Sequence, residues 1–388
     1  MARVLHVNHT AVVSGAERSL LALLDHTDAA RVAGVCCPPG PLATQIEARG
    51  LPWFETAEPH ARFDASPTDR LAAVSRLARI GPAVERAARR TKADVVHANS
   101  VRTALGLSFS TSRIVAHVRD VLPPGRTATS AKRVLVARSA RIVGISSFVA
   151  SRFSADLARP GRWVIIDNPI DLRDLPVRDP ETRPQERGGS GFDPHVPLAL
   201  VIGQITPWKR QLLAIEAVAA AHEQGMPVGL AIVGSVKFTE GRTGETNRAY
   251  ERLLRRRAVQ LGVERSVSFL GERDDVGRLM GAADLVLIPS RDEPFGRTAA
   301  EAIASGVPVL TSTVGGPADV VARCGGGVVV SDDEPNSWAS EIVSMVRRAS
   351  GAGVGVDPRA IASVRSAFDA DRHAEEMGRT FDDVAAGR

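Results

Sequence analysis

Lysine and aromatic residues are scarce in this chain of 388 residues, and the scarcity of aromatic residues argues against a nucleic-acid-binding protein. Lysine occurs at four positions among 49 basic residues, so arginine is the default cation, and each lysine is more informative than any single arginine. Aromatic residues make up 4% of the chain, and the arginines are spread along it. Nucleic-acid binders instead gather basic charge in a stripe and add aromatic rings for stacking. With a net charge of +5, nucleic acid is not an expected partner, although weak attraction to phosphate or anionic lipid is allowed.

Cysteines and long apolar runs are also few. Cys36, Cys37 and Cys324 show neither disulfide nor metal-site spacing, and such a sparse, odd count fits a reduced cytosolic protein. No stretch approaches the roughly 18 apolar residues that a membrane-spanning helix needs. The apolar run at residues 4–7 is too short for a signal peptide. We therefore expect a cytoplasmic protein with, at most, peripheral membrane contact.

What the chain does contain is a repeated alternation of short β-rich runs and longer helical patterns. This alternation is typical of parallel sheets covered by helices on both faces, and the length suits two domains of roughly 170–190 residues. The alternation stops between Leu172 and His195, where proline, glycine and charged residues dominate. We predict an α/β protein with Rossmann-like domains at residues 1–172 and 197–365. Residues 173–196 form the predicted linker, and a C-terminal helix at residues 366–388 is expected to pack back on the N-terminal domain.

Individual elements follow from the same pattern. The predicted strands are 4–7, 33–37, 94–97, 114–117, 140–145 and 163–166, then 198–202, 229–233, 267–270, 285–288, 307–311 and 327–330. The clearest predicted helices are 15–24, 42–49, 211–223, 250–261 and 298–305. A loop is expected at residues 237–248, where it could cover a ligand. In open parallel sheets ligands bind at the carboxyl ends of the strands, so the informative residues should directly follow each strand.

The segment after the predicted strand 285–288 contains two glutamates, eight positions apart. Glu293 lies in the loop, whereas Glu301 lies about two turns into the following helix. The backbone N–H donors of that helix start belong to Phe295, Gly296, Arg297 and Thr298, and they suit anionic oxygens. Glu301 could hold the two hydroxyls of a ribose, and Glu293 the hydroxyls of a sugar beside the phosphates. The spacing alone equally allows an acidic helix start followed by a surface glutamate.

This segment resembles the signature of glycosyltransferase family 4, with Pro-Phe-Gly inside the Glu-x₇-Glu spacing and AIASGVPV at residues 302–309. The resemblance implies the GT-B fold, in which two Rossmann-like domains face each other across a cleft. It also implies a retaining transfer of a hexose or amino-hexose from a nucleoside diphosphate sugar, foremost a UDP-sugar, to a hydroxyl. No Asp-x-Asp pair follows a strand, and no residue cluster has metal-ligand spacing. A metal-independent reaction without a cofactor is therefore predicted, in which protein charge stabilises the leaving diphosphate.

A second match lies at residues 201–210, VIGQITPWKR, which resembles the family loop whose basic pair neutralises the diphosphate. Lys209 falls on the lysine of that pattern and is assigned the catalytic role of stabilising the leaving group, with Gly203 binding the donor. Gln204 stands where the family usually has arginine, so Arg210 or Arg297 would have to supply the missing charge.

Three further segments resemble family loops. Residues 269–272 resemble the loop whose backbone meets the nucleobase, which makes Gly271 a donor-binding candidate. Residues 313–319 resemble the glycine pair near the cleft. Residues 14–18 resemble the Gly-Gly-Ala-Glu loop, where Gly15 would let backbone N–H groups approach the donor phosphate.

His117 ends the predicted strand 114–117 at the place where the family has a histidine beside the donor sugar. The resemblance implies that His117 donates or accepts a hydrogen bond that orients the sugar. The alternative is a histidine with a purely structural role. Arg119 and Asp120 are weaker candidates for the same rim, and His97 fits a buried core position equally well.

The acceptor is expected on the N-terminal domain, around residues 9–15, 62–64 and 99–102. Because no strong basic amphipathic helix stands out, a small soluble acceptor, such as an antibiotic or other secondary-metabolite precursor, is favoured over a lipid-linked or polysaccharide one. The alternatives of another class are a GT-B-like epimerase or phosphorylase, or a noncatalytic subunit that binds sugar nucleotides. The oligomeric state stays open.

Overall fold

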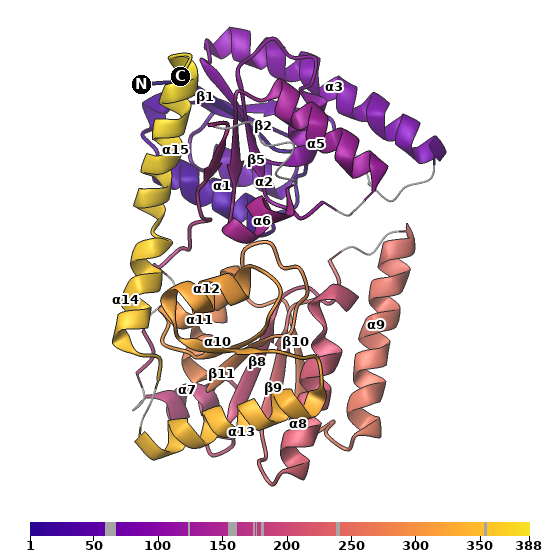
Figure 1. Ribbon diagram of the computed structural model, residues 1–388, viewed down its shortest axis with the longest axis vertical. Coiled ribbons are helices and arrows are strands. Elements are labelled where there is room, and N and C mark those ends of the chain that lie inside the picture. The colour runs from indigo at the N-terminus through magenta and orange to yellow at the C-terminus, as the bar shows by residue number, and fades with distance from the viewer. Residues whose placement is uncertain are drawn as a thin grey trace. The chain divides into compact units, whose positions relative to one another are not determined.

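A computed structural model describes residues 1–58, 67–122, 125–153, 161–173, 175, 177–179, 182–237, 241–352 and 355–388. The chain divides into two compact units (Figure 1). Unit 1 comprises Met1–Ile170 together with Phe368–Arg388, and unit 2 comprises Asp171–Ala367. No helix among the described residues is both long and apolar enough to cross a membrane.

Unit 1 is a parallel sheet of seven strands in the order β3-β2-β1-β4-β5-β6-β7. The strands are β1 Val4–Val7, β2 Val32–Cys37, β3 Trp53–Glu55, β4 Val95–Ala98, β5 Ile114–Val118, β6 Arg141–Gly144 and β7 Trp163–Ile165. The helices are α1 Gly15–Asp25, α2 Pro41–Glu47, α3 Pro67–Thr91, α4 Val101–Gly106, α5 Arg126–Arg138, α6 Ser147–Arg152 and α15 Ala370–Ala385, with a short 3₁₀ turn at Ala29–Arg31. The central strands β1, β4 and β5 are buried along their whole length, which explains why their sequences are apolar except for one buried histidine in each: His6, His97 and His117.

The C-terminal helix α15 is part of unit 1, although the chain reaches it only after completing unit 2 (yellow in Figure 1). Its residues Met377, Phe381 and Val384 belong to the same buried cluster as Val4 of β1 and Val95 of β4. This apolar face fixes α15 against the sheet and closes one side of the core of unit 1.

Unit 2 is a parallel sheet of six strands in the order β10-β9-β8-β11-β12-β13. The strands are β8 Leu198–Ile202, β9 Gly229–Val233, β10 Val267–Gly271, β11 Leu285–Ile288, β12 Val309–Ser312 and β13 Gly327–Val330. The helices are α7 Arg183–Gly189, α8 Gln211–Glu223, α9 Gly241–Gln260, α10 Val276–Ala282, α11 Arg297–Ala304, α12 Gly316–Cys324, α13 Pro335–Ala352 and α14 Pro358–Ala367, with a 3₁₀ turn at Pro207–Lys209. The fully buried indole of Trp338 anchors α13 in a core shared with α8.

The predicted α/β class with two Rossmann-like units is confirmed. Every predicted strand falls on an observed one, with ends that differ by at most two residues, which is within the ordinary uncertainty of element boundaries. The short strand β3 was not predicted. Its three residues Trp53–Glu55 are too few to show a pattern.

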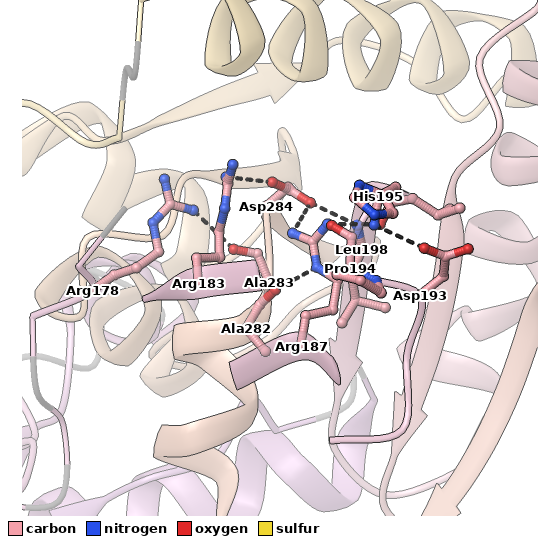
Figure 2. A network of polar contacts seen from close by, with 11 residues as sticks. Arg178, Arg183, Arg187, Asp193, Pro194, His195, Leu198, Ala282, Ala283 and Asp284 are labelled. Carbon is pink, nitrogen blue, oxygen red and sulfur yellow. Dashed lines mark hydrogen bonds and ion pairs between the residues drawn. The ribbon is translucent and has the colours of Figure 1, made fainter. Parts of the chain in front are cut away.

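The expected linker at residues 173–196 contains α7, which packs on α10 inside unit 2. Figure 2 shows how charge fixes this segment: the carboxylate of Asp284 accepts hydrogen bonds from Arg183 and Arg187, both at 2.5 Å, and from the backbone N–H of Leu198 at 2.7 Å. The Arg187 side chain is only 5% exposed and also donates to the carbonyl of Ala282. The sequence showed no apolar period here because buried ion pairs, not apolar packing, hold the segment.

The expected loop at residues 237–248 is also different in the structure, because α9 already begins at Gly241. Buried side chains recur at Asn247, Tyr250, Leu254 and Ala258, which is the spacing of one helical face. Glycine and threonine near residue 241 suggested a loop, but packing of this face overrides their weak helix propensity.

Candidate functional site

The carboxyl edge of the unit 2 sheet brings together the two loops that carry the predicted site. From β8 the chain crosses to β9 on one side, whereas β11 lies on the other side, so the order of strands reverses between β8 and β11. Ligands of open α/β sheets bind at such a switch point. The loop after β8 contains Lys209, the loop after β11 contains Glu293, and the N–H of Arg291 donates to the carbonyl of Trp208 at 3.1 Å between them.

Lys209 and Glu293 form an ion pair at this edge. The Lys209 Nζ lies 2.9 Å from Glu293 Oε2, and the two side chains are 12% and 9% exposed. Gly203 makes room for the lysine stem, because an added Cβ there would lie 3.3 Å from Lys209 Cε. An anionic ligand at this edge would compete with Glu293 for the ammonium, and the low local exposure strengthens that competition.

The loop of Glu293 rests on the glycine pair at the start of α12. The N–H of Gly316 donates to the carbonyl of Glu293 at 2.7 Å, and Glu293 pairs with Gly315 in an isolated β-bridge. A Cβ added to Gly316 would lie 2.2 Å from the carbonyl oxygen of Phe295. Only glycine permits this backbone approach, so the pair positions the carboxylate loop.

The helix start after this loop is built as the sequence predicted. Gly296 is the N-cap in the left-handed region with φ 89°, and α11 begins at Arg297. Phe295 is buried, Thr298 is half-buried, and the first-turn N–H groups of the helix are donors of the kind that bind anions. Glu301 accepts a 2.6 Å hydrogen bond from Arg297 Nε, which holds its carboxylate on the first two turns of the helix.

Arg210 and Arg297 were the two candidates to replace the cation missing at Gln204. Arg210, left-handed with φ 54°, forms an ion pair with Asp333, and Arg297 pairs with Glu301. Both guanidinium groups are therefore neutralised by carboxylates on their own unit. Whether either one turns to a ligand stays a prediction.

Three glycines end the neighbouring strands β8, β9 and β10. The N–H of Gly203 donates to the carbonyl of Val233 at 2.9 Å, and the N–H of Gly234 donates to Gly271 at 2.7 Å. A Cβ on Gly234 would lie 2.2 Å from the carbonyl oxygen of Gly203. The predicted donor-binding positions Gly203 and Gly271 thus lie on one continuous stretch of closely packed backbone.

In unit 1 a buried polar relay crosses the corresponding switch point between β1 and β4. Arg119 Nε donates to Asn99 Oδ1 at 2.9 Å, Asn99 Nδ2 donates to Asn8 Oδ1 at 2.9 Å, and Asn8 Nδ2 donates to Glu17 Oε1 at 3.1 Å. Glu17 also accepts the N–H of Ser14 at 3.1 Å and so fixes the start of α1. No local pattern in the sequence reveals this relay, although Asn8, Asn99 and Arg119 each directly follow a strand.

Gly15 begins α1 at the end of this relay. The residue is exposed, and an added Cβ would have no neighbour within 4 Å. Its backbone is therefore exposed, and the predicted contact with the donor phosphate stays a prediction, whereas Glu17 is buried and structural.

His117 is fully buried beneath the edge, not exposed on it. A guanidinium can only donate, so the 3.2 Å contact from Arg119 makes His117 Nδ1 an acceptor and places the proton on Nε2. His97 Nε2 then donates to the same Nδ1 at 3.1 Å, and its own Nδ1 accepts from His6 at 2.9 Å. Burial, with Arg119 adding to it, lowers the pKa of His117 well below its ordinary value. His117 is thus a neutral donor whose Nε2 has no hydrogen-bond partner among the described residues.

The expected acceptor loops at residues 9–15 and 99–102 lie close together because β1 and β4 are neighbours. Ser100 Oγ lies 3.0 Å from His9 Nδ1, and Arg102 lies 3.5 Å from His9 Nε2. Burial, followed by the charge of Arg102, lowers the pKa of His9 to about 4. Residues 62–64, the third expected acceptor segment, lie outside the described residues. His97 is a fully buried core residue, and no group of three or more metal-ligating side chains occurs in the described part of the chain.

Comparison with known proteins agrees with this geometry. Residues 182–349 match the family model described as glycosyl transferases group 1. Over this segment, the chain is similar to the group 1 glycosyltransferases. The resemblance to glycosyltransferase family 4 found in the sequence is thereby confirmed, and so is the assignment to a family of transferases.

Curated relatives are similar over part of their length. A D-inositol 3-phosphate glycosyltransferase of Mycobacterium marinum is 29% identical over 294 residues, which are 74% of this chain and 60% of the relative. A protein of the same name from Jonesia denitrificans is 33% identical over 189 residues, 47% of this chain and 42% of the relative. The chain therefore spans at most about 60% of the length of these two relatives.

Solved structures share the fold over nearly the whole chain. Anabaena HepE, solved in complex with UDP and glucose, has a TM-score of 0.79 and 23% identity over 98% of this chain and 100% of that protein. Sucrose-phosphate synthase from Thermosynechococcus elongatus has a TM-score of 0.73 and 16% identity over the full length of both chains. These likenesses confirm the predicted GT-B fold.

Proposed function

We propose that the chain transfers a hexose or amino-hexose from a nucleoside diphosphate sugar to an acceptor hydroxyl, with retention of the anomeric configuration. The observation that carries the proposal is the Lys209–Glu293 ion pair at the switch point, beside the helix start of α11. A diphosphate binding there would draw the ammonium away from Glu293. The released carboxylate could then accept hydrogen bonds from hydroxyls of the sugar, so binding of the donor would prepare its own sugar site.

The transfer breaks the bond between the anomeric carbon and the diphosphate oxygen and forms a bond between that carbon and the acceptor oxygen. The acceptor hydroxyl gives up its proton to the leaving diphosphate, on which negative charge develops. The Lys209 ammonium and the first-turn N–H groups of α11 stabilise that charge in the proposed reaction. These protein groups take the role that a divalent cation has in metal-dependent transferases. UDP-sugars are the proposed donors, which the UDP complexes of Anabaena HepE support.

The proposed acceptor is a small hydroxylated molecule, such as an antibiotic or other secondary-metabolite precursor. The curated relatives are named for D-inositol 3-phosphate, which adds a phosphorylated cyclitol to the molecules worth testing. Arg102 beside His9 offers a cation in the expected acceptor loops and is compatible with such a phosphate.

Incubation of the protein with UDP-, GDP- and ADP-sugars, with and without D-inositol 3-phosphate, tests the proposal. We expect slow release of UDP from one donor, faster release with a true acceptor, and an NMR coupling constant that shows retention in the product. Glu293→Gln should abolish the release. Glu216→Gln is the matched control, because it removes a carboxylate that pairs with Arg257 on the outer helix layer, and it should leave the rate unchanged.

The outcomes separate the alternatives. A sugar epimer or a sugar 1-phosphate as product would indicate an epimerase or a phosphorylase. Tight binding of a sugar nucleotide without turnover would indicate a noncatalytic subunit. Either result overturns the proposed transfer.

A further inference from the structure

A cavity of about 650 Å³ lies at the amino edge of the unit 1 sheet, the edge opposite to the candidate site. Its lining combines cations with ring side chains: Arg3, Ala33, Pro52, Trp53, Phe54, Arg90, Thr91 and Lys92. Arg3 directly precedes β1, Pro52 precedes β3, and Thr91 ends α3. At a rise of about 3.3 Å per residue, the four residues of β1 alone separate the two edges by roughly 13 Å. This cavity is thus distinct from the candidate donor and acceptor positions.

Three cations line the cavity, and although the Asp94 carboxylate accepts the backbone N–H of Arg3 at 2.8 Å, none of the three side chains pairs with a carboxylate of a described residue. Arg3, Arg90 and Lys92 are all exposed, and none forms an ion pair with another described residue. By contrast, Arg89 on the same last turn of α3 pairs with Glu85 and does not line the cavity. Gathered like charges repel one another unless an anion joins them, so the lining favours an anionic ligand.

Lys92 occupies a backbone conformation that suits glycine. Its φ is 53°, and the hydrogen bonds from the N–H of Lys92 to Arg89 and of Ala93 to Ala88 place it at the left-handed position that ends a helix. Among the described residues, left-handed φ values outside glycine occur only at Lys92, Arg210 and Asp292.

The other two left-handed residues directly adjoin Lys209 and Glu293 in the candidate donor site. The chain contains 34 glycines and four lysines, yet it places a lysine at residue 92. Backbone strain of this kind persists at functional positions, where the side chain has a use that glycine lacks.

The apolar wall of the cavity is held in place by close packing. Gly34 of β2 has φ 145°, and a Cβ there would lie 2.7 Å from the Phe54 ring and 2.8 Å from the carbonyl oxygen of Pro52. The indole Nε1 of Trp53 donates to the carbonyl of Cys37 at 3.1 Å, which fixes that ring as well. Because successive side chains of a strand point to opposite faces, the Trp53 ring packs with Val35 and Cys37 on one face, whereas the Phe54 ring lies over Gly34 on the other. Phe54 is therefore the oriented ring that we place beside the three cations.

We propose that this cavity binds a small phosphorylated ligand that carries a planar ring. Arg3, Arg90 and Lys92 hold the phosphate, and Phe54 provides the surface for the ring. A nucleoside monophosphate is the simplest such molecule. The proposal is independent of the transfer reaction, because it uses none of the residues of the candidate site.

Calorimetric titration of the full chain with 5′-AMP and with inorganic phosphate tests this site. We expect 5′-AMP to bind at least about threefold more tightly than phosphate, because only 5′-AMP has a ring to stack. Lys92→Gly should weaken 5′-AMP binding by about five- to tenfold, the effect of removing one charge-assisted contact. The melting temperature of this variant should stay the same or rise, because glycine suits the left-handed position. Arg3→Gln should weaken binding to a similar degree.

Two controls decide whether the cavity is the binding site. Arg89→Gln removes the same charge from the same helix end and should leave 5′-AMP binding within about twofold. Lys209→Ala should also leave it within about twofold, because that residue lies in the other unit. Four results would each overturn the proposal. Lys92→Gly and Arg89→Gln could weaken 5′-AMP binding equally, or Lys209→Ala could abolish it. Phosphate and 5′-AMP could bind equally tightly, or 5′-AMP could fail to bind at all.

Discussion

Replacement of either partner of the Lys209–Glu293 pair should lower stability but change nucleotide affinity in opposite directions. Removing one partner of a fully buried ion pair typically costs about 3–5 kcal/mol, because the other charge is left uncompensated. Here the side chains keep 12% and 9% exposure at an open sheet edge, so water reaches the remaining charge. We therefore expect Lys209→Met and Glu293→Gln each to lower the free energy of unfolding by about 2–3 kcal/mol in urea titrations.

Affinity for UDP separates the two roles. Lys209→Met removes the proposed diphosphate partner and should weaken UDP binding by about ten- to a hundredfold, the equivalent of about 1.4–2.8 kcal/mol. Glu293→Gln removes the carboxylate that competes for the same ammonium, so UDP should bind about fivefold or more tightly while sugar transfer is lost. Isothermal titration calorimetry with UDP measures both effects. Glu216→Gln, which breaks an ion pair on the outer helix layer, should change neither. Weaker UDP binding by Glu293→Gln would refute the competition between ligand and carboxylate.

Three further predictions concern stability and pH. Asp284→Ala leaves the charge of the buried Arg187 uncompensated and should lower the free energy of unfolding in urea by about 3–5 kcal/mol. The double variant Asp284→Ala/Arg187→Met should recover most of that loss. A loss below about 1 kcal/mol in the single variant would contradict the network in Figure 2. Gly316→Ala places a Cβ against the carbonyl of Phe295. It should lower the free energy of unfolding by about 1–3 kcal/mol and lower the rate at which UDP is released from the sugar nucleotide. An unchanged melting temperature would contradict the close approach. Burial lowers the pKa of His373 from 6.5 to about 3, so below pH 6.5 the unfolded chain binds a proton that the folded chain does not. Stability from this residue is complete above pH 6.5 and falls by about 1.4 kcal/mol per pH unit down to pH 3, and His373→Gln should flatten the slope of urea midpoints against pH.

The sequence predicted the elements of the fold because strands buried on both faces of a parallel sheet have short, predominantly apolar sequences. It failed where polar contacts replace apolar packing. Residues 173–196 looked like a linker, since nothing in their sequence reveals that Arg187 and Asp284, 97 positions apart, form an ion pair. The start of α9 was hidden for a different reason: local propensity at Gly241 points to a loop, whereas packing of the buried face stabilises the helix.

The sequence by itself identified the residue types of the candidate site. Lys209, a lysine in an arginine-rich chain, and Glu301, eight residues after Glu293 across a helix start, could be selected without coordinates. These signals are local, since they depend on spacing along one loop or one helix.

The tertiary structure alone decided how those residues meet. The strand order places β8 beside β11 and thereby brings Lys209 to 2.9 Å from Glu293, although 84 positions separate them in the sequence. It also buries His117 beneath the edge of unit 1, where Arg119 sets its tautomer. A strand sequence reports that its residues are buried, but which strands are neighbours is set by the packing of the whole sheet, and the charge partners follow from that order.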